Sequence, residues 1–490
     1  MTTRQIAAST FWQIASQATM AALSILTVKF VAIGLSQELA GVYNSAYGLL
    51  QLFGILADFG LYAVAVREVS RAKGEAREEV LGTLIVLRLG TLLLSLGAAL
   101  LFVWILPAWH GTPLPAAVTV AAFVPFFTLL AGILRTVFQV SYSMHLVFIA
   151  EVAQRIFTVS AIGAFLFLGI RGSTDVRLCY VFLFIGGIGA LLLFLLSLIF
   201  STGFIRIRLH FDMQLTRRIL SLAAPFGIAF LCTALYRQLD VTLIALLRDD
   251  YQLQNAYYGF VLRMVETGYV IPTFLLNSTL PILAERHENG EETAGLLGKT
   301  LLAILLLGTV SLLFSALWSR PLILLLTTEA YLSTPLQAGS DTALRLMSLP
   351  IFLNGVITYA FYVLLTKRVW RPLVAILLMG AALSIGLNSI LIPLYGFVGA
   401  AATSIVVHIL LAAFLLPRSL RAMPIRLPRA AILRWGGFSV LFAIALWTYS
   451  PLLRGEIATI FGLVSITALM AVLGGLLGLH HSFLGEPHRG

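Results

Sequence analysis

The sequence is poor in charge. Of its 490 residues, 11% are Asp, Glu, Lys or Arg, whereas 60% are hydrophobic. Soluble domains carry about 25% charged residues, so this composition excludes an ordinary soluble protein. The apolar residues form long unbroken runs, and a bilayer-spanning helix needs roughly 20 of them. Only helices and closed barrels satisfy every backbone polar group in lipid, and runs without strand-like alternation favour helices.

Cysteine and catalytic motifs are also scarce. Cys179 and Cys232 lie in apolar stretches, which excludes a disulfide scaffold and indicates two small buried side chains. The sequence holds no GxxxxGK[ST] phosphate loop. His408 is a lone histidine in an apolar run, which favours a packing role over a metal ligand. We therefore predict no cofactor, no metal site and no catalytic residue.

The apolar runs predict an all-α, polytopic membrane protein with about fourteen spans. The predicted spans are residues 10–35, 40–63, 80–106, 115–138, 147–170, 178–200, 219–247, 256–283, 299–319, 341–365, 373–393, 397–417, 432–450 and 457–479.

The basic residues predict the orientation. Loops on the side of the N-terminus, with the two ends of the chain, hold 20 Lys and Arg, and the opposite loops hold 4, which are Arg171, Arg177, Arg248 and Arg454. Cytoplasmic loops carry the excess of Lys and Arg, so both termini are predicted to be cytoplasmic. This bias also accounts for the net charge of +11 and makes nucleic acid an unexpected partner.

Two segments suggest an internal repeat. Residues 41–71 resemble residues 255–285, with Tyr43 and Tyr257 near the start and a mid-helix glycine in both. Six predicted spans per repeat would make the copies parallel. The predicted domains are an N-lobe (1–205, spans 1–6), a C-lobe (206–420, spans 7–12) and residues 421–490 with spans 13–14 and the tail. Two such lobes suit alternating access.

Eight basic residues fall within or near predicted spans. Arg135, Arg320 and Arg345 lie near helix ends, where they are expected to snorkel to the headgroups. Five others lie deeper: Lys29, Arg88, Arg155, Arg237 and Arg263. Each would cost roughly 2.5–3.5 kcal/mol if it faced lipid, so they are predicted to face a partner or a water-filled cavity.

Three of the deep cations have an acid at helical spacing. The pairs are Glu151 with Arg155, Arg237 with Asp240, and Arg263 with Glu266. Residues three or four apart share a helix face, so each pair is either a structural ion pair or part of a site. Asp240 and Glu266 are also candidate ion-coupling carboxylates.

Lys29 and Arg88 have no acid on their own helix face, and Asp58 is the only other deep acid of the N-lobe. Unpaired cations in a cavity predict an anionic substrate.

Several motifs resemble the polysaccharide exporters of the MOP (multidrug/oligosaccharidyl-lipid/polysaccharide) superfamily. LNSILIPLYGFVGAAA (387–402) is similar to their span 11–12 hairpin, and ADFGLYAVAVREVSR (57–71) to the exit of their second span. APFGIAFLCTALYRQLDVTLIALL (224–247) and PTFLLNSTLPILAE (272–285) resemble their seventh and eighth spans. The likeness runs in order from about residue 5 to 420.

The resemblance implies a two-lobed, MATE-like fold in the inner (plasma) membrane and a flippase, not an enzyme. Its substrate would be an undecaprenyl-pyrophosphate-linked glycan for O-antigen, lipopolysaccharide or another surface polysaccharide, with membrane lipid and other polysaccharide assembly proteins as further partners. By position, Arg263 is the best match to the cations that engage pyrophosphate in relatives, with Lys29 and Arg88 as contributors. The peptidoglycan-precursor branch has arginines along its first span, where this sequence has Gln13 and Gln17.

Two alternatives remain open. A multidrug or cation antiporter would share the fold but use carboxylates. A membrane-embedded glycosyltransferase or polymerase would need catalytic residues on a sizeable outer loop, where the sequence offers the short Asp249–Asp250 pair.

The orientation is testable at Ser173, in a predicted outer loop. A Ser173→Cys variant should react with a membrane-impermeant maleimide on intact cells, because both termini are predicted to be cytoplasmic. Protection of that cysteine in whole cells, with labelling after lysis, would reverse the orientation.

Overall fold

The computed structural model describes residues 3–205, 210–367, 369–453 and 455–476. The chain divides into two compact units, residues 1–259 and 260–490, with the boundary inside one long helix. The lobe boundaries follow from the sequence repeat. The division into compact units does not test that repeat, so these boundaries stay a prediction.

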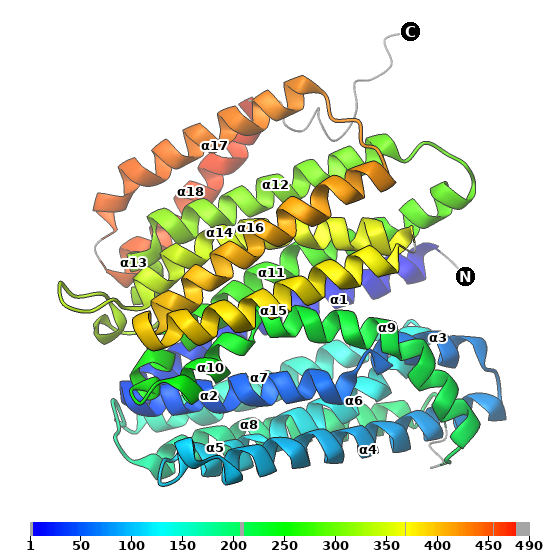
Figure 1. Ribbon diagram of the computed structural model, residues 1–490, viewed down its shortest axis with the longest axis horizontal. Helices are drawn as coiled ribbons and strands as arrows, with labels where there is room; N and C mark the ends of the chain where they lie inside the picture. Colours follow the sequence, from blue (N-terminus) through cyan, green and yellow to red (C-terminus); the bar gives the residue numbers. More distant parts are fainter. Residues whose placement is uncertain (1–2, 206–209, 368, 454, 477–490) are drawn as a thin grey trace. The chain divides into compact units, whose positions relative to one another are not determined.

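The regular elements of the first unit, in its described part, are helices, apart from one isolated β-bridge between Leu35 and Ser173 (Figure 1). Its helices are α1 (Thr3–Gly34), α2 (Gln37–Asp58), α3 (Leu61–Arg71), α4 (Glu75–Ile105), η1 (Pro107–Trp109), α5 (Leu114–Ala121), α6 (Phe123–Val140), α7 (Met144–Phe167), α8 (Val176–Ser201), α9 (Met213–Arg237), α10 (Leu239–Leu247) and the start of α11 (Tyr251–Glu288).

The second unit continues α11 and adds the remaining helices. They are α12 (Ala294–Leu317), α13 (Ser319–Leu326), η2 (Glu329–Tyr331), α14 (Ser340–Thr366), α15 (Trp370–Tyr395), α16 (Phe397–Ala422), α17 (Arg429–Tyr449), η3 (Ser450–Leu452) and α18 (Glu456–Leu476). The indole of Trp318, fully buried, donates to the Leu446 carbonyl at 2.9 Å and so fastens α17 to the rest of the unit.

Twelve helical segments of the described residues are long and apolar enough to cross a membrane. The chain is therefore a multi-pass membrane protein with an all-α fold, as predicted. Helices α1 and α11 coincide with the two predicted spans that are not among the twelve, and the count of about fourteen stays a prediction.

The predicted spans 40–63 and 219–247 are broken in their interior by residues outside the helical conformation, whereas the span 115–138 is divided into α5 and α6 at Ala122, which keeps right-handed helical angles. The span 40–63 is broken after Asp58, because Phe59 and Gly60 take left-handed conformations with φ of 38° and 71°. The span 219–247 is broken at Gln238, between α9 and α10. Apolar composition marks membrane depth but does not reveal one residue that leaves the helical conformation, so the sequence could not show these breaks.

Helices α2, α10 and α11 meet through small residues and buried amides of the first unit. Asn44 donates to the Asn255 carbonyl at 3.1 Å, and Asn255 donates to Ser45 and to the Val241 carbonyl, both at 2.9 Å. Gly41 permits this approach, because a Cβ there would lie 1.6 Å from the carbonyl oxygen of Gln252.

A Gly41→Ala variant should therefore force α2 from α11 and lower the free energy of unfolding by roughly 1–3 kcal/mol. Thermal unfolding of the purified protein in detergent measures this loss. Gly90→Ala is the matched control: it lies in α4 with no atom near the added methyl group, so it should be neutral or stabilising by up to about 1 kcal/mol. Equal behaviour of the two variants would contradict the packing.

Candidate functional site

The break between α2 and α3 is held by Arg88 of α4. Arg88 has 1% of its side chain exposed and forms an ion pair with the carboxylate of Asp58, and its Nη1 donates to the Ala57 carbonyl at 3.2 Å. Both groups belong to the last turn of α2, whose carbonyls carry partial negative charge. The guanidinium therefore acts as a cationic cap on a helix end inside the membrane-spanning region.

This contact corrects one expectation. The sequence predicts Arg88 to be an unpaired cavity cation, and that is wrong, because Asp58 reaches it from the neighbouring helix. Asp58 lies on α2, 30 residues before Arg88, so spacing along α4 does not connect the two. A direct substrate contact for Arg88 stays an untested prediction.

Two further contacts fix the same junction. Tyr62, in the first turn of α3, donates to Gln139 Oε1 of α6 at 2.7 Å. On another side, a Cβ at Gly60 would lie 3.0 Å from the Gly227 nitrogen of α9, and a Cβ at Gly227 would lie 2.8 Å from the Phe59 oxygen. The junction is thus tied to α4, α6 and α9 at once.

A second ion pair lies close to the first. Arg135 of α6 donates to Glu151 of α7 at 2.8 Å, and Ser16 of α1 donates to the other oxygen of that carboxylate. Gln139, which accepts from Tyr62, lies one turn beyond Arg135 on α6. The two pairs therefore form one set, which we name the first-unit charge cluster and which comprises Ser16, Asp58, Tyr62, Arg88, Arg135, Gln139 and Glu151.

The second pair also differs from the prediction. Arg135 was expected to snorkel to the headgroups, and instead it bonds a carboxylate on another helix. Glu151 was considered as a partner for Arg155 of its own helix, whereas Arg135 and Ser16 are the contacts described for its carboxylate. Ser16, Tyr62, Arg135 and Gln139 were missed as members of the cluster, since no spacing within one helix connects them.

The other predicted cations of the first unit lie elsewhere on its helices. Arg155 is one turn beyond Glu151 on α7, next to the charge cluster in sequence. Lys29 of α1 lies 13 residues beyond Ser16, about 20 Å further along the helix. Both are half-buried. The side chains of Gln13 and Gln17 lie outside the part of the chain that the structure describes.

Arg237 and Asp240 do not lie on one continuous helix, contrary to the spacing argument. Arg237 ends α9, and Asp240 belongs to the first turn of α10 beyond the break. Asp240 has 2% of its surface exposed and accepts a hydrogen bond from the Tyr258 hydroxyl at 2.8 Å. Its use in ion coupling stays a prediction.

Arg263 and Glu266 lie in the second unit on the uninterrupted α11, as the spacing predicts. Both side chains are half-buried. Thr267 donates to the Arg263 carbonyl at 3.0 Å, which is a local bond within the helix.

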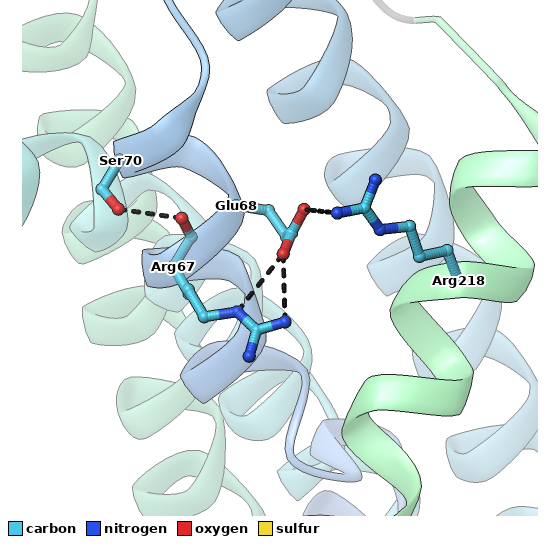
Figure 2. Close-up of polar contacts among 4 residues, drawn as sticks. All are labelled: Arg67, Glu68, Ser70 and Arg218. Carbon is cyan, nitrogen blue, oxygen red and sulfur yellow. Dashed lines mark hydrogen bonds and ion pairs between the residues drawn. The ribbon is translucent and has the colours of Figure 1, made fainter.

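The end of α3 predicted to be cytoplasmic carries a carboxylate between two arginines (Figure 2). Glu68, with 7% of its side chain exposed, accepts from Arg67 at 3.3 Å and lies 3.5 Å from Arg218 of α9. Ser70 donates to the Arg67 carbonyl at 2.8 Å. Glu68 therefore links α3 to α9, and these arginines have a structural contact besides their contribution to topology.

One carboxylate of the predicted outer acidic pair, that of Asp250, is held within its own loop. Arg248 donates to both carboxylate oxygens of Asp250, at 2.7 and 2.9 Å, and Gln254 donates at 2.8 Å. The hydrogen bonds from Arg248 hold the pKa of Asp250 below its usual range, against the effect of partial burial. A carboxylate used in this way closes a loop and is poorly suited to act as a general acid.

The described helices define a class, that of multi-pass, all-α membrane proteins. The structure of a lipid II flippase, MurJ, in an inward closed conformation matches with a TM-score of 0.71 and 13% identity, over 96% of this chain and 98% of that chain. An inward-facing MATE multidrug resistance transporter matches with a TM-score of 0.61 and 14% identity, over 84% and 98%. A MATE transporter of Vibrio cholerae matches at 0.54 and 14%, over 86% and 97%. At such identities the likeness shows the fold.

The family follows from the sequence itself. A profile of the family described as polysaccharide biosynthesis protein matches residues 6–287, which is more than half of the chain. The chain belongs to that family, as its motifs predict. Among curated proteins, none matches it.

The role of Arg88 can be tested by removal. Arg88→Ala leaves the Asp58 carboxylate and the end of α2 without their cap. The free energy of unfolding should therefore fall by about 3 kcal/mol. This is near the lower end for a buried ion pair, because the Asp58 side chain is 28% exposed. The double variant Arg88→Met/Asp58→Leu removes both charges and should recover most of that loss. Unfolding in detergent measures both.

Arg218→Ala is the matched control, since Arg218 also pairs with a carboxylate, that of Glu68, but is 61% exposed. It should change stability by less than about 1 kcal/mol. A loss in Arg88→Ala no larger than in this control would refute the capping role.

Proposed function

We propose that this protein is a flippase that moves an undecaprenyl-pyrophosphate-linked oligosaccharide from the cytoplasmic to the outer leaflet of the inner membrane, for surface polysaccharide biosynthesis. Both termini would be cytoplasmic, and transport would follow alternating access through a cationic cavity. The observation that carries the proposal is the family match over residues 6–287. The fold shared with a lipid II flippase supports a lipid-linked substrate.

The intramembrane charges support an anionic substrate. A pyrophosphate that leaves water requires cationic hydrogen-bond donors, and arginine suits phosphate oxygens through its forked geometry. We assign this contact to Arg263, with Lys29, Arg155 and Arg237 as further candidates. Arg88 would contribute indirectly, because it is buried in its ion pair with Asp58.

The drug or cation antiporter is the second candidate, and the MATE fold favours it. Such a transporter needs carboxylates that can accept a cation. In the first unit, Asp58 is bonded by Arg88, Glu151 by Arg135, and Asp240 by Tyr258. Carboxylates occupied by internal donors are less available to a cationic drug, so we prefer the anionic substrate.

A glycosyltransferase or polymerase receives less support. Its best acidic candidate, Asp250, is bonded within its own loop. Elongation of a glycan on a lipid acceptor by the purified protein would establish the enzyme.

Arg263→Ala tests the proposal. Loss of a desolvated cation–phosphate contact should lower the rate of surface polysaccharide export by roughly tenfold or more, and Arg263→Lys should recover part of it. Export is measured by complementation of a strain that lacks the native protein, with the amount of protein followed by immunoblot.

Arg418→Ala is the control, because Arg418 is exposed on α16 and donates to its own helix at Phe414. Its export should stay normal. Normal export by Arg263→Ala at an equal protein level would remove Arg263 from the site, and drug resistance conferred by the wild-type protein without glycan export would favour the antiporter.

A further inference from the structure

The ion pairs between α3 and α9 hold more positive than negative charge. Glu68 is 7% exposed and lies between Arg67, which is 45% exposed, and Arg218, which is 61% exposed (Figure 2). We name these three residues the arginine bridge. Two guanidiniums share one carboxylate, so one positive charge of the bridge has no opposite charge within it.

The carboxylate uses only part of each guanidinium. Glu68 accepts from Nε and Nη2 of Arg67, both at 3.3 Å, and its other oxygen lies 3.5 Å from Nη2 of Arg218. Within the part of the chain that the structure describes, Nη1 of Arg67 and both Nε and Nη1 of Arg218 have no bonded partner. Figure 2 shows these nitrogens pointing away from the carboxylate. The bridge therefore orients two guanidiniums from different helices and leaves their outer N–H groups to a further acceptor.

The nearest other carboxylates do not take these donors. Asp212 caps α9 by accepting from the backbone nitrogens of Gln214 and Leu215. Among the described acids, Glu68 alone pairs with the arginines of the bridge. The remaining charged side chains close to the bridge in sequence are Arg71, Lys73, Glu75, Arg77, Glu78, Glu79 and Arg217.

Exposed apolar side chains indicate that the bridge lies at the level of the lipid headgroups. Arg67 lies four residues before the end of α3, and Arg218 lies five residues after the start of α9, which is about 6 and 8 Å from those helix ends. Phe211 and Met213, at the start of α9, are 52% and 54% exposed. Apolar side chains that open outward beyond the arginines favour a membrane surface over a dissolved partner such as nucleic acid.

We propose that the arginine bridge binds the headgroup phosphate of an anionic phospholipid. Such lipids give the cytoplasmic leaflet its negative surface potential, and guanidinium N–H groups suit phosphate oxygens. The outer N–H groups of Arg67 and Arg218 donate to the phosphate, which supplies the negative charge that Glu68 leaves unmatched. A lipid bound in this way joins α3 to α9 from outside the protein. The site is separate from the deep cations assigned to pyrophosphate, and it does not rest on the proposed function.

The test measures lipid binding by the full-length protein, purified in detergent without any glycan. Native mass spectrometry titrates phosphatidylglycerol, with zwitterionic phosphatidylcholine as the reference, and gives the affinity for the first lipid bound. The wild-type protein should prefer phosphatidylglycerol by roughly fivefold or more, the effect expected of one basic residue near a membrane surface. Arg67→Gln/Arg218→Gln should lower the affinity for phosphatidylglycerol by roughly tenfold.

Arg418→Gln/Arg421→Gln is the matched control. It removes two exposed arginines from the end of α16, which is also predicted to be cytoplasmic, so the change in net charge is the same. Its affinity for the first phosphatidylglycerol should stay that of the wild-type protein. An equal loss in both double variants would mean that net charge alone matters, and it would overturn the site. Unchanged affinity in the bridge variant overturns it as well.

Two further measurements complete the test. If the bridge variant does not fold, Arg218→Gln decides, and unaltered binding in that variant overturns the proposal. Undecaprenyl phosphate is titrated in the same way, and a larger loss for it than for phosphatidylglycerol in the bridge variant would assign the arginines to the substrate carrier instead. Because binding is measured without transport, failure here leaves the flippase function standing. Normal export by Arg263→Ala would refute that site and keep the lipid site.

Discussion

The architecture of the first unit depends on one requirement, that a charge taken out of water must find an opposite charge or a dipole. Arg88 meets it with the Asp58 carboxylate and the last carbonyls of α2. The same contact lets α2 stop inside the membrane-spanning region, since exposed helix carbonyls are tolerated in lipid only where something satisfies them. The chain can then turn through Phe59 and Gly60 into α3, which closes on α9 through Gly227 and, at its far end, through Glu68.

This use of charge also shapes what the protein can bind. Asp58 and Glu151 each have an arginine partner within the first unit, and Tyr258 occupies Asp240. Arginines and lysines outnumber acids in the chain by 32 to 21, so internal pairing consumes carboxylates before it consumes cations. Most of the excess of basic over acidic residues lies in the loops. Within the predicted spans, basic residues also outnumber acidic ones. This balance agrees with the anionic substrate, a pyrophosphate, that we propose.

The fold is shared by transporters of different substrates, which the MurJ and MATE likenesses illustrate. What distinguishes one from another is therefore the chemistry of a few side chains on a common set of helices. In this chain α11 concentrates several of them: Asn255 packs against α2, Arg263 and Glu266 share a face, and Tyr269 reaches His408.

The sequence by itself determined the membrane class, the helical architecture and the family. The membrane class and the helices follow from the amount and continuity of apolar residues. The family follows from local motifs such as the segment 57–71, which lies within the matched residues 6–287. Neither property depends on what a helix contacts. The sequence also identified the deep cations, since their position within apolar runs is a local property. The tertiary structure decided which of them are paired. Asp58 reaches Arg88, Glu151 reaches Arg135, and Tyr269 reaches His408 across helices, and the breaks at Phe59 and Gln238 arise at such junctions. Helical spacing relates residues of one helix only, so contacts between helices, which decide whether a buried charge is satisfied, could not be read from it.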